Sequence, residues 1–137
     1  MIGRATIVLA IALLGACATP ALAEQTIFAS TPTIKLDRGG SADRVFGKVR
    51  SDARACEQRR KIRLLHRPVD QKQRWSVVAK MRTDGTGAWS FRPEPNSAGD
   101  RFATAGNWHV KVNEVKVNSG GGVITCKEKF SSSMFVG

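Results

Sequence analysis

Short segments that alternate apolar and polar residues constrain the fold of this chain more than any other feature of its sequence. The clearest of them, residues 108–112 (WHVKV), alternates at every position, and residues 61–64 (KIRL) do the same. Period-two alternation is typical of a β-strand with one buried face. No segment after residue 23 sustains the repeat of about 3.6 residues that an amphipathic helix needs. The alternation therefore predicts an all-β domain.

Turn-forming residues divide the chain into strands at short spacing, which is typical of two packed antiparallel sheets. Gly47 lies inside one strand and predicts a bulge or a close backbone approach. The inward positions are predicted to include either Phe46 or Val49, and all three tryptophans, Trp75, Trp89 and Trp108. We expect an antiparallel two-sheet sandwich of about seven strands, with segments at 33–36, 44–50, 61–64, 74–81, 88–92, 108–112, 123–130 and 134–136.

The N-terminal residues have the three parts of a secretory signal peptide. Arg4 is the single charge before an apolar run at residues 5–16, and residues 21–23 (ALA) form an A-x-A cleavage site. The apolar run is too short to span a membrane, which takes about 20 residues. We therefore expect export to the periplasm or the outside of the cell, with cleavage after Ala23.

Two further expectations follow from this N-terminus. Residues 14–17 (LGAC) resemble a bacterial lipobox, which would place a lipid anchor on Cys17, whereas cleavage after Ala23 would discard that cysteine. The mature chain would keep a net charge of +10, because Arg4 is the only charge lost from a total of +11. We expect a signal peptide at 1–23, an N-terminal extension with one edge strand at 24–44, and the sandwich at 45–137.

Cys56 and Cys126 are the two cysteines that remain after cleavage, and in an oxidising compartment they predict a disulfide. Closing a loop of 70 positions stabilises a fold by roughly 4 kcal/mol in the chain-entropy description. The alternative, a metal site, needs more ligands, and His66 and His109 stand at no metal-ligand spacing. No metal or other cofactor is expected.

The order of several motifs resembles the transthyretin-like (prealbumin-type) sandwich domains, which include carboxypeptidase regulatory-like modules. The motifs are residues 46–51 (FGKVRS), Cys56, residues 60–64 (RKIRL), 83–89 (TDGTGAW), 106–112 (GNWHVKV), and Cys126 followed by Ser131 or Ser132. An immunoglobulin-like sandwich has a similar profile. The 5-hydroxyisourate hydrolases of the wider group end in a Tyr-Arg-Gly-Ser motif that this chain lacks, so the resemblance implies no such activity.

A basic cluster between residues 59 and 67 is the strongest functional signal. If the outward faces of neighbouring strands align, Lys48, Arg50, Lys111, Lys127 and Lys129 could extend it into a positive sheet face. Such a face would attract anionic polymers, although charge on an exposed face also serves plain solvation. Aromatic interleaving is predicted to be weak, because the tryptophans are assigned to the core. The candidate anion-binding residues are Arg59, Arg60, Lys61, Arg63 and Arg67.

Two functions are therefore expected for this chain, and catalysis is not one of them. The first is a non-catalytic exported domain with a structural or adhesive role at the cell envelope. The second is a binding module for an anionic envelope polymer, meaning lipopolysaccharide, a wall polymer or nucleic acid. The partner would accordingly be such a polymer or another envelope protein.

Overall fold

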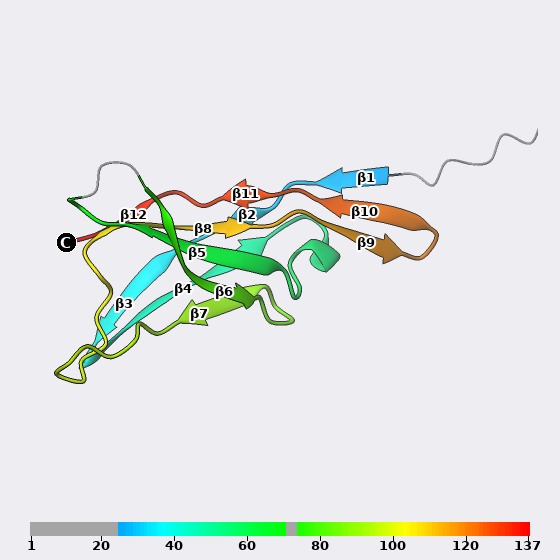
Figure 1. Cartoon of the computed structure of the whole chain (residues 1–137). Helices are drawn as coiled ribbons and strands as arrows, with labels where there is room; N and C mark the ends of the chain where they lie inside the picture. The colour runs from blue at the N-terminus through cyan, green and yellow to red at the C-terminus, as the bar shows by residue number, and fades with distance from the viewer. Residues whose placement is uncertain (1–24, 71–73) are drawn as a thin grey trace, which may run out of the picture.

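The computed structural model describes residues 25–70 and 74–137, and this part of the chain is all-β. Its strands form three sheets (Figure 1). A single turn of 3-10 helix, η1, precedes the fifth strand. The strands are β1 (Gln25–Phe28), β2 (Thr31–Pro32), β3 (Lys35–Gly39), β4 (Ala42–Arg50), β5 (Lys61–Arg67), β6 (Ser76–Arg82), β7 (Ala88–Phe91), β8 (Gly106–Val112), β9 (Val115–Ser119), β10 (Gly122–Cys126), β11 (Lys129–Phe130) and β12 (Met134–Val136), and η1 is Arg54–Cys56.

The large sheet has the strand order β11-β8-β5-β6, with β12 also paired to β8, and all of its pairs are antiparallel. Its centre is formed by the two segments with the clearest alternation. Ile62, Leu64, Val110 and Val112 are buried, as predicted, while Arg63 between them is exposed. The alternation therefore predicted both the strands and their inward faces.

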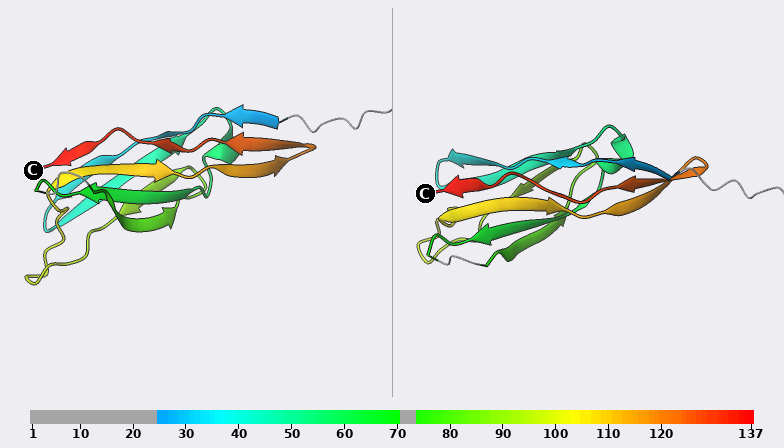
Figure 2. Two further views of the ribbon diagram at one scale, coloured as in Figure 1. Left: turned by 45° about the horizontal axis from the view of Figure 1, so that its top comes forward. Right: turned by 90° about the horizontal axis from the view of Figure 1, so that it is seen from above.

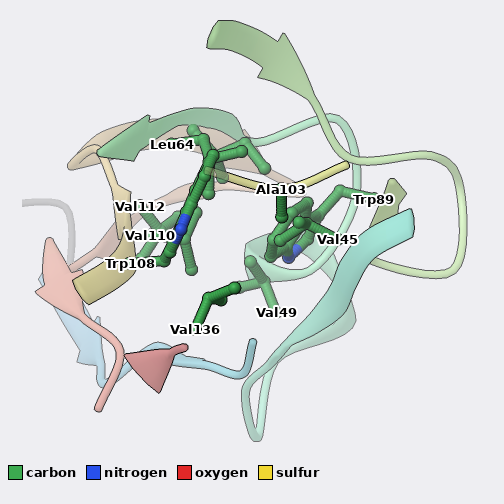
Figure 3. Close-up of a cluster of buried hydrophobic side chains, with 10 residues drawn as sticks. Val45, Val49, Leu64, Trp89, Ala103, Trp108, Val110, Val112 and Val136 are labelled. Atoms are coloured by element: carbon green, nitrogen blue, oxygen red, sulfur yellow. The ribbon is translucent and has the colours of Figure 1, made fainter. Parts of the chain in front are cut away.

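The small sheet is built around β4, which pairs with β2 and β3 along one edge and with β7 along the other. Its inward residues meet those of the large sheet in one apolar core (Figure 3). The two sheets thus form a β-sandwich-like body. The buried core cluster consists of Val45, Val49, Ile62, Leu64, Trp89, Ala103, Trp108, Val110, Val112 and Val136.

A three-stranded ribbon extends beyond one end of this body (Figure 2). It has the order β1-β10-β9, in which β1 runs parallel to β10 and β9 antiparallel to it. Gly120 and Gly121 close the β9–β10 hairpin with positive φ. The disulfide predicted between Cys56 and Cys126 is present and fastens η1 to the end of β10.

Two expectations differ from the structure. The extension at 24–44 contains β1, β2, β3 and the start of β4, so the expected boundary at residue 45 falls inside a strand. The number of strands exceeds seven because of this segment, because β9 is a strand of its own, and because the expected strand at 123–130 is divided into β10 and β11. Pro32 and the polar residues around it hid β2, although a proline is tolerated at a sheet edge.

The signal peptide and Cys17 lie outside the described residues. Within residues 25–70 and 74–137, no helix has the length and apolar character needed to cross a membrane.

Gly47 marks a close backbone approach, as predicted. A Cβ atom at this position would collide with the carbonyl group of Thr33, where the chain crosses from β2 to β3, and would press on the indole of Trp89. Both obstacles lie in packed parts of the fold, and the carbonyl belongs to the backbone. The site therefore has no room for a side chain.

We predict that Gly47→Ala lowers the free energy of unfolding by roughly 1–3 kcal/mol, the usual cost of forcing an extra methyl group into a packed site. Urea unfolding followed by tryptophan fluorescence measures the change. Gly85→Ala is the matched control, because nothing lies within 4 Å of a Cβ atom there. Equal effects of the two substitutions would contradict the close approach at Gly47.

Candidate basic and aromatic interface

The candidate site is the outer face of the large sheet, where strand pairing brings basic residues from three strands into one row. Lys111 of β8 lies directly opposite Arg63 of β5, which lies opposite Lys80 of β6. Residues directly opposite each other point to the same side of a sheet. Phe130 of β11 lies opposite Lys111 and extends the row. One side of the sheet therefore carries three adjacent cations and an aromatic ring.

Aromatic residues occupy the same face at the next outward position of β8, His109, two residues before Lys111. The rings of Trp75 and His109 stack with centroids 3.7 Å apart and planes inclined by 6°. The ring of Phe130 lies 5.0 Å from that of His109. Arg67 places its guanidinium carbon 5.0 Å from the centre of the Trp75 ring, and Lys111 places its ammonium 5.5 Å from that of Phe130. Cations and rings thus interleave in the geometry of cation–π contacts.

Trp75 does not belong to the core, and the expectation of weak aromatic interleaving is wrong. The register between β5 and β6 shifts between Leu64 and Leu65, so that Leu64 lies opposite Ala79 and Leu65 opposite Val77. Val78 is the extra residue of this β-bulge, which reverses the alternation along β6. Ala79 packs against the core, whereas Val77 is 45% exposed. Trp75 consequently turns outward onto His109.

The seven residues that define this surface, hereafter the basic aromatic face, are Arg63, Arg67, Trp75, Lys80, His109, Lys111 and Phe130. Acidic side chains are scarce on it: the ion pair recorded there among the described residues joins Lys111 to the exposed Glu128, over 3.3 Å. Lys61 and Arg82, opposite each other at the next level of β5 and β6, are exposed and continue the positive charge.

The sequence-predicted cluster divides in two. Lys61, Arg63 and Arg67 lie on the outer side of β5, as expected, and Lys111 joins them from β8. Arg59 is exposed in the turn before β5, where it has a positive φ of 50°.

Arg60, by contrast, is buried and 1% exposed, so it does not contribute to the surface. It has the same parity along the chain as Ile62 and Leu64. That parity was the signal that could have placed Arg60 on the inner side.

The Arg60 guanidinium has a structural role, because it donates hydrogen bonds to four oxygen acceptors. One nitrogen, Nη1, donates to the carbonyl of Cys56 over 2.6 Å and to Ser30 Oγ over 2.9 Å. The other, Nη2, donates to the carbonyls of Asn113 (2.6 Å) and Lys127 (3.3 Å). Burial lowers the pKa of Arg60, but a guanidinium keeps its charge in proteins. One cation thus joins η1, the chain before β2, the β8–β9 turn and the chain after β10.

The remaining basic residues lie elsewhere. Lys127 pairs with Glu114 over 3.3 Å. Lys48 and Arg50 belong to the small sheet, where they line a groove of about 660 Å³ rather than joining Arg63. This groove is a second positive surface. Its charged lining residues are Lys35, Arg44, Lys48, Arg50, Arg82 and Asp84.

His66 is buried beneath the face, with its Nε2 atom 2.9 Å from the carbonyl oxygen of Ala105 and its ring against Trp108. In residues 25–70 and 74–137, no three His, Cys, Asp or Glu side chains gather in a way that could hold a metal ion. Comparisons with protein-family profiles, with curated proteins and with solved structures return no match to this chain.

We predict that Arg60→Met lowers the free energy of unfolding by more than the roughly 1–3 kcal/mol that one orphaned buried acceptor costs, because four acceptors lose their donor together. Chemical unfolding measures the loss. Arg59→Met is the matched control at the neighbouring exposed position, and it should change stability little. A small effect of Arg60→Met would refute the structural role.

A second prediction concerns pH. Burial, and then the charge of Arg67, lower the pKa of His109 below its ordinary value of 6.5, and its Nε2 atom is buried with no hydrogen-bond partner in the described part of the chain. As pH falls below about 6.5, His109 therefore binds a proton more readily in the unfolded chain than in the folded protein. The free energy of unfolding should consequently fall as pH falls. His109→Phe keeps an aromatic ring beside Trp75 and should reduce this slope.

Urea unfolding at about pH 7.5 and about pH 5.5 compares the two proteins across the range in which histidine titrates. Asp84 does not interfere with this comparison. Hydrogen bonds from Thr86 and Ala88 lower the pKa of its carboxyl, so the stability that it contributes is lost only in more acidic solution, below its ordinary value of 3.8. An identical slope in His109→Phe would show that His109 is not the group involved.

Proposed function

We propose that this protein is an exported, non-catalytic binding module that holds an anionic polymer on its basic aromatic face. The observation that carries the proposal is the row of three cations, Lys111, Arg63 and Lys80, in direct register across three strands. Like charges placed directly opposite each other destabilise a sheet. A bound polyanion would relieve that repulsion, so the row favours a ligand with several negative charges.

The net charge supports a polymeric ligand. A chain of net charge +11 attracts polyanions over distances of about one Debye length, and each cation that contacts the polymer releases a counterion. The face is also built on paired strands and holds its cations at fixed spacing, because Arg63 and Lys111 belong to the central strands β5 and β8. Cations at a fixed spacing favour a ligand whose negative charges also repeat at a regular spacing, as they do along a polymer.

The scaffold and its location form part of the same proposal. The A-x-A site after a short apolar run supports export, and a disulfide is typical of proteins outside the cytosol. A two-layer transthyretin-like or immunoglobulin-like arrangement is supported by the motif order and by the β-sandwich-like body. Envelope polymers such as lipopolysaccharide, wall polymers or free nucleic acid would then be within reach.

A structural or adhesive role at the envelope is the second candidate. Exposed apolar rings at Phe102, Phe130 and Phe135 favour it, because such rings can pack against another envelope protein. The two roles differ in their dependence on salt. Binding to a polyanion weakens steeply as salt rises, whereas apolar adhesion does not.

We predict that the protein is retained on heparin at low salt, and that Arg63→Glu combined with Arg67→Glu elutes at markedly lower salt. The reason is that each substitution removes one cation of the basic aromatic face and adds a repelling charge. The salt concentration at elution, together with the slope of affinity against salt, measures the effect.

The control is Arg101→Glu combined with Lys116→Glu, which makes the same change in net charge at two exposed residues outside the face. Its elution should shift much less. Equal shifts would mean that overall charge alone causes retention, and an unshifted Arg63/Arg67 variant would exclude the face. Unchanged retention across a wide range of salt would favour apolar adhesion instead.

A further inference from the structure

We infer that the anionic polymer is a single-stranded nucleic acid, whose bases stack on aromatic rings at the edge of the basic aromatic face. This inference rests on the proposed function and specifies its ligand. The added observation is that two phenylalanine rings on this side of the large sheet are largely open to solvent: Phe130 is 49% exposed and Phe135 is 65% exposed.

The two open rings lie along the same edge of β8, the edge that does not pair with β5. Phe130 lies opposite Lys111 and Phe135 lies opposite Asn107, so both point outward from the edge of the sheet beside β8. The stacked pair of Trp75 and His109 occupies the level between them. Alternate residues of a strand are roughly 7 Å apart, and the face therefore presents a ring at each of three levels with that spacing.

Cations accompany these rings. Lys111 and Arg63 lie at the level of Phe130, and Arg67 pairs with Asn107 at the level of Phe135. A single strand of nucleic acid offers the complementary pattern, since each nucleotide carries one flat base and one charged phosphate. Aromatic side chains beside a positive track are the usual platform for such strands. The alternation of rings and cations thus matches the alternation of bases and phosphates.

Other polyanions match only half of this surface. Sulfated or phosphorylated saccharides supply charge but no flat aromatic face. In a duplex the bases are already stacked on one another, so that the protein meets phosphates and base edges but no open face of a base. The phenylalanine rings could insert into the acyl region of an anionic lipid membrane, but such insertion would not require rings at regular positions along β8. The arrangement therefore favours a single strand over a saccharide, a duplex or a membrane.

The test measures binding of a fluorescent oligodeoxythymidine to the full mature chain, with a duplex of similar length and immobilised heparin as comparisons. Phe130→Ala and Phe135→Ala should each weaken binding to the oligodeoxythymidine by roughly five- to a hundredfold, as expected when a stacked base loses its ring. Their elution from heparin should not change, because neither substitution removes a cation. Tryptophan emission should be quenched by the oligodeoxythymidine, because Trp75 stacks on His109 at the level between those of Phe130 and Phe135.

Phe102→Ala is the matched control, since Phe102 is 51% exposed and belongs to the segment between β7 and β8. It should leave binding unchanged, and all three variants should unfold at similar urea concentrations. Equal affinity for duplex and single strand, or an equal loss in Phe102→Ala, would overturn the inference. So would phenylalanine variants that lose binding to phosphatidylglycerol vesicles but keep binding to the oligodeoxythymidine. Heparin retention would survive each of these outcomes, whereas failure to bind either heparin or the oligodeoxythymidine would contradict the proposed function itself.

Discussion

The buried guanidinium of Arg60 is the interaction on which the arrangement of the sheets depends. Its hydrogen bonds reach segments that adjoin all three sheets, and they lie beside the disulfide because two of the acceptors are the carbonyls of Cys56 and Lys127. A buried charge is costly unless its donors are satisfied. Four oxygen acceptors satisfy the two Nη atoms of this one, whereas its Nε atom is buried without a hydrogen-bond partner among the described residues. The covalent link fixes one end of the body, and the guanidinium sets the position of the strands that leave it.

Much of the fold could be predicted because short patterns in the sequence indicate it. Ile62, Leu64, Val110 and Val112 alternate with polar residues, and Cys56 and Cys126 form the predicted disulfide. Gly47 stood where a side chain would have been expected, and it proved to be a contact point between strands. The alternation and the glycine lie within the feature that each predicts, whereas the disulfide joins residues 70 positions apart and was predicted from the number of cysteines.

The candidate site was only partly predictable, because its geometry depends on register. The bulge at Val78 reverses the alternation of β6 and carries Trp75 from the expected core position to the outer face, and one residue in the sequence does not reveal such a bulge. Lys111 meets Arg63 only through the pairing of β5 with β8. The charge of Arg60 predicts an exposed side chain, whereas its parity with Ile62 and Leu64 predicts a buried one, and the structure follows the parity. Burial of an arginine depends on acceptors from distant segments, which no local pattern displays.

The disulfide limits the damage that a single proteolytic cut can do to this protein. The chain from Cys56 to Cys126 is a covalently closed loop that contains β5, β6 and β8, and with them Arg63, Arg67, Trp75, His109 and Lys111. A single cut by a protease anywhere within that loop would leave both fragments attached to each other. Phe130 and Phe135 lie outside the loop, so trimming of the C-terminal tail would remove the open rings and leave most of the positive charge in place.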